Sequence, residues 1–126
     1  MKYLLDTVTI VRYFAQTGSL GLQARSILEN NHHEFIISVI SLAEIMYLSE
    51  KNRITVDLQQ TLELIEKTNN YTIIDLNPDI LKVAAHLPFY ELHDRLILAT
   101  AKWLEIPILS SDKRFLNIDS ISVIWN

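Results

Sequence analysis

The sequence contains no cysteine, two glycines and three prolines among its 126 residues. Without cysteine the chain can form no disulfide, no thiolate metal site and no cysteine nucleophile, and this absence suits a reducing compartment. So little glycine and proline excludes collagen-like, low-complexity and flexible-linker sequences. A glycine-rich phosphate loop is also missing, which argues against a P-loop nucleotide hydrolase.

Long apolar runs and a targeting segment are missing too. Asp6 and Arg12 interrupt the N-terminal stretch that a signal peptide would keep apolar. The longest nearly apolar run, residues 35–48, contains Glu44 and is too short to span a bilayer. We therefore expect a soluble, cytoplasmic protein that does not act on a membrane.

The residues that are present predict one globular domain over residues 1–126. Hydrophobic residues make up 49% of the chain and charged residues 21%. A chain of this length buries roughly two-thirds of the surface that it exposes when unfolded, which is enough for its own core. Its 11 basic and 15 acidic side chains give a net charge of −4, which argues against constitutive tight binding of nucleic acid. Nucleic acid stays open as a transient substrate if cations neutralise an acidic site.

Short apolar runs alternate with helical segments along the chain. The expected strands cover residues 2–5, 34–39, 71–74, 107–109 and 121–124. The expected helices cover residues 8–16, 22–30, 41–51, 56–68, 77–88 and 93–104, with a short turn at 113–116. This alternation predicts an α/β fold, a three-layer α/β/α architecture with a largely parallel central sheet. In such sheets the binding crevice lies beyond the carboxyl ends of the strands.

Four acidic residues stand at matching positions in this topology. Asp6 and Asp112 directly follow apolar strands, whereas Glu44 and Asp94 lie in the first turns of expected helices. The spacing from Ser41 to Glu44 predicts a capping box at the start of that helix. All four acids can then meet at one edge of the sheet. Taken singly, each could be only a helix cap or a partner of a helix dipole, an effect of about 0.3–1 kcal/mol.

As a set, the four acids predict a site for a hard divalent cation. Carboxylates that gather without a cation repel one another and take up protons. Oxygen ligands without thiolates favour Mg²⁺ or Mn²⁺. Such a site suits phosphodiester hydrolysis, because a bound ion lowers the pKa of a water molecule and neutralises charge in the transition state.

Four sequence segments carry a family resemblance that extends along nearly the whole chain. They are LLDT at residues 4–7, SLAEI at 41–45, HDRLILATA at 93–101 and ILSSDKRF at 108–115. With these segments the chain resembles the PIN domain, and within it the VapC-type toxins of bacterial toxin–antitoxin pairs. The Leu87-Pro88 pair before the third segment is similar to one subgroup of these toxins.

The resemblance implies a Mg²⁺- or Mn²⁺-dependent endoribonuclease, the toxin of a type II toxin–antitoxin system. It implies RNA as substrate, a cognate antitoxin protein as inhibitor and a homodimer as the assembly. The metal-binding and catalytic acids of the family fall on Asp6, Glu44, Asp94 and Asp112. The hydroxyl that many members place before the last acid falls on Ser110.

The chain departs from the family pattern after the last acid. Some PIN nucleases carry a fifth acid there, but Lys113 and Arg114 occupy that stretch, so the number of metal ions stays open. These two residues and Arg95 could contact RNA phosphates or pair with the carboxylates. His93 could shuttle a proton or simply flank its helix.

An interface is expected on the early helices. They carry more large apolar side chains than one core face needs: Val11, Tyr13, Phe14, Ile45, Tyr47 and Leu48. Such a surplus predicts an exposed apolar patch for dimer or antitoxin contact.

Two other functions stay open. A PIN-like scaffold could act as a binding module without turnover, although the complete set of four acids argues against it. A phospho-accepting receiver domain also gathers acids at strand ends. Asp75, after the third strand, fits a receiver, but Asp6 is followed by Thr7 and Val8 rather than by a second acid.

Overall fold

The computed structural model describes residues 1–126 and has a five-stranded sheet in the order β3-β2-β1-β4-β5. Its strands are β1 (Lys2–Leu5), β2 (Glu34–Ser38), β3 (Tyr71–Ile74), β4 (Ile108–Leu109) and β5 (Val123–Ile124). Every neighbouring pair is parallel. The expected parallel sheet is therefore confirmed, and β1 lies at its centre.

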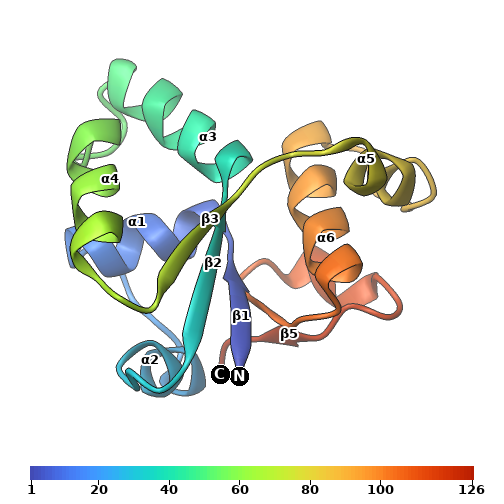
Figure 1. The fold of residues 1–126 in the computed structure, drawn as a ribbon, viewed down its shortest axis with the longest axis horizontal. Coiled ribbons are helices and arrows are strands. Elements are labelled where there is room, and N and C mark those ends of the chain that lie inside the picture. The colour runs from blue at the N-terminus through green and yellow to red at the C-terminus, as the bar shows by residue number, and fades with distance from the viewer.

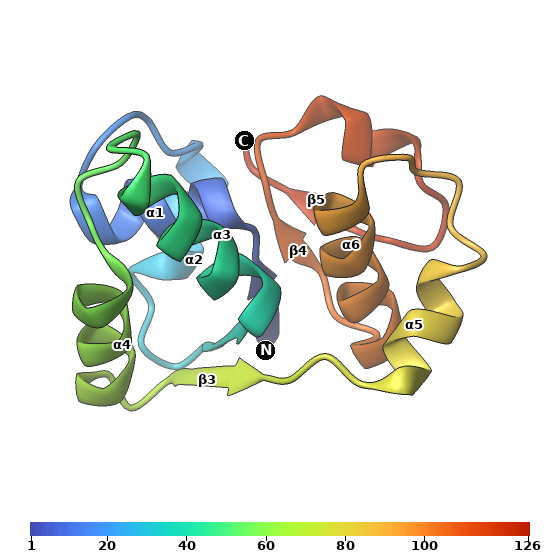
Figure 2. The ribbon, with the colours of Figure 1, turned by 90° about the horizontal axis from the view of Figure 1, so that it is seen from above.

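Helices cover both faces of this sheet (Figures 1 and 2). They are α1 (Thr7–Ala15), α2 (Leu22–Leu28), α3 (Val39–Glu50), α4 (Leu58–Lys67), α5 (Pro78–Ala84) and α6 (Leu92–Leu104), with a short 3₁₀ helix η1 (Lys113–Asn117). The first four pack on one face, and α5 and α6 pack on the other. The expected three-layer α/β/α fold is confirmed.

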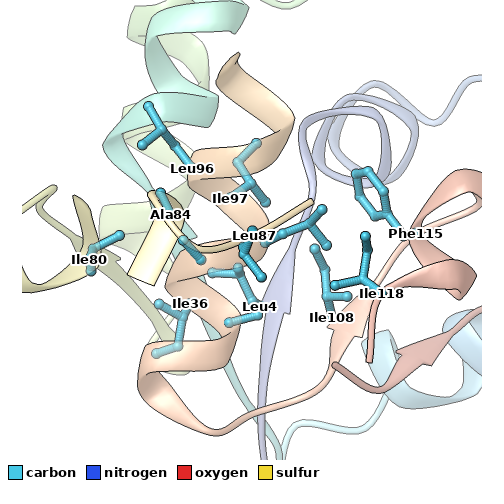
Figure 3. Packing of buried hydrophobic residues seen from close by; sticks show 13 residues of the cluster. Leu4, Ile36, Ile80, Ala84, Leu87, Leu96, Ile97, Ile108, Phe115 and Ile118 are labelled. Carbon is cyan, nitrogen blue, oxygen red and sulfur yellow. The ribbon is translucent and has the colours of Figure 1, made fainter. Parts of the chain in front are cut away.

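Alternate strand residues supply two separate apolar cores. Tyr3 and Leu5 of β1 point into the core under α1 to α4, while Leu4 between them points into the core under α5 and α6. Ile36 of β2 and Ile108 of β4 join Leu4, as Figure 3 shows. Because strands buried on both faces are apolar at every position, they appear in the sequence as continuous rather than alternating apolar runs.

The expected start of α3 is wrong. The helix begins at Val39, and its N-cap is Ser38, whose hydroxyl accepts a hydrogen bond from the backbone N–H of Ile40 at 3.0 Å. Ser41 is therefore a buried residue inside the helix, and Glu44 lies in its second turn. Ser38 and Ser41 both offer a capping hydroxyl, and the capping-box spacing from Ser41 to Glu44 favoured the wrong one. Several other elements are also shorter than expected: α2 ends at Leu28, α4 spans Leu58–Lys67, α5 ends at Ala84 and the last strand begins at Val123.

The expected apolar patch does not exist as a set. Ile45 is fully buried, and Val11, Tyr13 and Phe14 pack against the core under α1 to α4. Of the six side chains, Tyr47 is more than half exposed, at 53%. Most of these apolar side chains therefore pack against the sheet and do not form an exposed patch. No helix in the structure has the length and apolar character needed to cross a membrane.

Candidate active site

The centre of the sheet, between β1 and β4, is the place where the chain reverses the direction in which it adds strands. From β1 the sheet grows through β2 to β3, and on the other side β4 leads to β5. In open parallel sheets the crevice at such a reversal is the usual binding place. Asp6 follows β1 and Ser110 follows β4, and the Asp6 N–H donates to the Leu109 carbonyl at 3.3 Å.

Asp6 is buried and held on both carboxylate oxygens. Its Oδ1 accepts a hydrogen bond from the Thr9 N–H at 2.9 Å, so it caps α1 as the sequence allowed. Its Oδ2 accepts from the Ser110 hydroxyl at 2.5 Å. Burial raises the pKa of Asp6, the bonds from Ser110 and Thr9 oppose that rise, and the charge of Asp112 adds to it. A cation beside Asp6 would relieve the unfavourable burial of its charge.

Ser110 connects Asp6 to Asp112, the first and the last of the four candidate acids. Besides donating to Asp6, its Oγ accepts from the Asp112 N–H at 3.0 Å. Asp112 in turn caps η1, with Oδ1 accepting from the Arg114 N–H at 2.9 Å. The cap interpretation is thus confirmed for both aspartates. Capping uses one carboxylate lone pair, so it leaves ligand capacity on each side chain.

Glu44 is held by a residue that the sequence analysis did not single out. The Thr7 hydroxyl, in the first turn of α1, donates to Glu44 Oε1 at 2.6 Å and contacts Ser41 Oγ at 3.0 Å. Thr7 directly follows Asp6, and this adjacency was the signal that could have revealed it. The contact ties the acid of α3 to the helix that Asp6 caps.

Asp94 lies in the first turn of α6, as expected, with 24% of its side chain exposed. The N-cap is Glu91, which also went unnoticed; its Oε2 accepts from the Asp94 N–H at 2.6 Å. Burial raises the pKa of Asp94 to about 6, the charges of Glu91, Glu44 and Asp112 add to the rise, and Arg114 opposes it. Two of the other three predicted acids, Glu44 and Asp112, therefore raise the pKa of Asp94.

Arg114 joins Asp94 to Asp112. Its Nη2 lies 2.6 Å from Asp112 Oδ2 and 3.2 Å from Asp94 Oδ2, and its Nε lies 3.0 Å from Asp112 Oδ1. Hydrogen bonds from the Arg114 side chain lower the pKa of Asp112. For Arg114, pairing with the carboxylates is thus the arrangement found. The other two basic candidates, Arg95 and Lys113, form no ion pair with these acids.

The donor set suits Mg²⁺ or Mn²⁺, because carboxylates and hydroxyls are hard oxygen ligands. The side chains as they stand bring no three of the histidines, aspartates and glutamates close enough to hold one ion. Asp6 and Asp112 are joined through Ser110, and Asp94 and Asp112 through Arg114, while Glu44 accepts a hydrogen bond from Thr7. The acids therefore have the right donor atoms for Mg²⁺ or Mn²⁺, but their side chains must move closer together to coordinate one ion.

The remaining candidate residues, His93 and Arg95, lie beside Asp94 on α6. His93 is exposed, with Nδ1 3.2 Å from Glu91 Oε1. Arg95 has a buried Nε without a hydrogen-bond partner. A hollow of about 400 Å³ beside the site is lined by Ala43, Glu44, Tyr47, Leu48 and His93. A larger groove of about 660 Å³ lies over α1 and α2 and contains none of the four acids.

This fold and site define an α/β protein in which Asp6 and Asp112 follow neighbouring parallel strands, with Glu44 and Asp94 on the helices α3 and α6. A family description of the PIN domain matches residues 3–121, so the chain belongs to the PIN-domain family. Asp75, on which a receiver domain depended, follows β3 at the edge of the sheet, two strands from Asp6. Comparison with curated proteins gives no match.

Several solved structures share the fold. VapBC2 from Rickettsia felis, bound to a DNA fragment from their promoter, has a TM-score of 0.76 at 20% identity and covers 100% of both chains. DNA-bound VapBC from Salmonella typhimurium has a TM-score of 0.72 at 18% identity, covering 98% of this chain and 97% of that one. A toxin–antitoxin complex from Klebsiella pneumoniae has a TM-score of 0.65 at 23% identity, covering 97% and 95%. At these identities the likeness shows a common fold.

Proposed function

We propose that this chain is a Mg²⁺- or Mn²⁺-dependent endoribonuclease that hydrolyses phosphodiester bonds, with residues 1–126 acting as one domain. The observation that carries the proposal is the chain of contacts from Asp6 through Ser110 to Asp112 where the sheet reverses direction. Glu44 and Asp94 lie near enough for their charges to act on one another. Membership of the PIN-domain family supports the same chemistry.

Each residue of the site has a role in this proposal. The four acids, which would hold the metal, are Asp6, Glu44, Asp94 and Asp112. Ser110 orients the buried Asp6, and Thr7 orients Glu44. A bound ion supplies Lewis acidity, which activates water and neutralises charge on the phosphate. Lys113 and Arg114 stand where a fifth acid would be, so we propose one fully formed metal site.

The test is cleavage of single-stranded or loop RNA by the purified protein. We expect cleavage with Mg²⁺ or Mn²⁺, loss in excess EDTA and recovery on adding metal, with 3′-hydroxyl and 5′-phosphate ends. Asp94→Asn should abolish cleavage. Glu66→Gln removes an equal charge from an exposed position on α4 and should cleave normally. Undiminished activity in EDTA would contradict the metal requirement.

We further propose that the chain is a cytoplasmic toxin, held in check by a cognate antitoxin and assembled as a homodimer. Membership of the PIN family and likeness to chains solved within VapBC complexes support this role. The acidic edge and the net charge of −4 favour an antitoxin that places a basic segment at the site. A monomeric mass at tens of micromolar would contradict the dimer.

Competition separates inhibition at the acidic edge from inhibition elsewhere. Mg²⁺ titrated into a preformed complex should weaken antitoxin binding more than a monovalent salt of equal ionic strength does. Equal effects would place the inhibitory contact outside the acidic edge.

An RNA-binding module without turnover is the second candidate, favoured by the pairing of Arg114 with two of the acids. Binding of RNA without cleavage at any metal concentration would select it.

A further inference from the structure

Arg114 is the one basic side chain that pairs with the carboxylates of two of the four acids. Its guanidinium contacts both oxygens of Asp112 and one oxygen of Asp94. Planar guanidinium groups form such forked hydrogen bonds with carboxylates, and these are stronger than ordinary ion pairs. The guanidinium thus bridges Asp94 Oδ2 on α6 and Asp112 Oδ2 at the start of η1.

An aromatic ring contacts the guanidinium in addition to the two carboxylates. The Arg114 Cζ lies 5.5 Å from the ring centroid of Phe89. Phe89 in turn packs edge-on against the buried Phe115, with ring centroids 5.5 Å apart. A guanidinium over an aromatic face is a favourable arrangement. The packing therefore gives Arg114 a defined place above the two acids.

The side chain of Arg114 is not needed to build the local fold. It is 64% exposed, and its contacts are with the carboxylates and the Phe89 face. The cap of η1 uses the backbone N–H of Arg114, which any residue except proline supplies. A substitution can therefore remove the guanidinium and leave the capped turn in place.

We propose that Arg114 is a built-in counter-cation of the acidic site, which a divalent ion must displace from Asp94 and Asp112 in order to bind. This inference rests on the proposed metal site. A guanidinium and a metal ion cannot share the same carboxylate lone pairs, so the two cations compete. Arg114 is then a positioning residue that keeps the metal-free acids together and sets the metal concentration at which the site fills.

The test compares Mn²⁺ binding by the intact protein and its variants, measured by calorimetry and by the electron paramagnetic resonance signal of free Mn²⁺. Arg114→Gln should bind Mn²⁺ roughly three- to tenfold more tightly than the unsubstituted protein. Lys113→Gln is the matched control. It removes the same positive charge at the neighbouring position, and the Lys113 side chain pairs with no acid. It should change the affinity by less than about twofold.

Arg114→Lys keeps the charge but loses the fork, so it should bind Mn²⁺ with intermediate affinity. It also serves as the second variant if Arg114→Gln folds poorly. Equal or weaker Mn²⁺ binding by Arg114→Gln, with binding by the unsubstituted protein intact, overturns the counter-cation and leaves the metal site standing. No Mn²⁺ binding by any of these proteins overturns both. An equal gain in Arg114→Gln and Lys113→Gln would mean that only net charge matters, and it also overturns the inference.

Discussion

Asp94 shows how a single carboxyl group links the site to the stability of the protein. Its pKa is raised from 3.8 to about 6, first by burial and then by the charges of Glu91 and Glu44. The folded protein therefore holds this proton more tightly than the unfolded chain does. The resulting stabilisation is fully present below pH 4 and is lost as the pH rises through about 6.

Asp94→Asn should therefore stabilise the metal-free protein at pH 7.5, by about 1 kcal/mol after allowance for solvent screening. At pH 4 the gain should vanish, since the aspartate is then protonated. Urea unfolding at the two pH values measures the difference. A loss of stability at pH 7.5 would mean that the pairing of Asp94 with Arg114 outweighs the repulsion from the other acids.

Asp6 separates a structural role from a chemical one. Asp6→Asn should lose RNA cleavage, because it removes a proposed metal ligand. Its unfolding midpoint should stay unchanged or rise at neutral pH, because asparagine caps helices as well as aspartate does and burial disfavours the charge of Asp6. Asp6→Ala should unfold more easily than Asp6→Asn by about 1–3 kcal/mol, because the Thr9 N–H and the Ser110 hydroxyl lose their buried partner. Equal stability of the two variants would show that the cap contributes nothing.

Among the elements, the link between α1 and α3 positions Glu44. Thr7→Val removes the hydroxyl that bonds Glu44 and keeps the shape of the side chain. We expect a loss of about 1 kcal/mol in stability and weaker Mn²⁺ binding, because Glu44 is no longer oriented. Thr7→Ser is the control, since it keeps the hydroxyl. Unchanged Mn²⁺ binding by Thr7→Val would mean that Glu44 needs no positioning.

The elements also show how far the sequence could be interpreted. Apolar runs between helical segments predicted the parallel sheet and placed Asp6 and Asp112 at strand ends, because strand position depends on local pattern. The start of α3 was misplaced by three residues, because Ser38 and Ser41 could each cap the helix and only the backbone shows which one does. The pairing of Arg114 with Asp94 was one of two readings, because it depends on how α6 and η1 come together in space.

At the scale of the whole molecule, Gly21 lies where Trp125, after β5, packs against the start of α2. The Ala24 N–H donates to the Trp125 carbonyl at 3.0 Å, and a Cβ at Gly21 would overlap that carbonyl oxygen. Gly21→Ala should therefore lower stability by about 1–3 kcal/mol, because backbone must move to make room. Gln23→Ala, at an exposed position of the same helix, should change it by less than about 0.5 kcal/mol. Thermal unfolding of both variants tests the docking, and equal midpoints would contradict it.

The hydrogen bond from Ser110 to Asp6 joins residues 104 positions apart. During synthesis, β1 leaves the ribosome long before β4, so for most of that time one side of the central strand has no neighbour. At 5–20 residues per second, the delay between the two residues is roughly 5–20 seconds. No growing chain shorter than 112 residues contains all four acids. Every product of a translation that stops before Asp112 therefore lacks an assembled site, and any chemistry that the site performs begins only after β4 and Asp112 have been made.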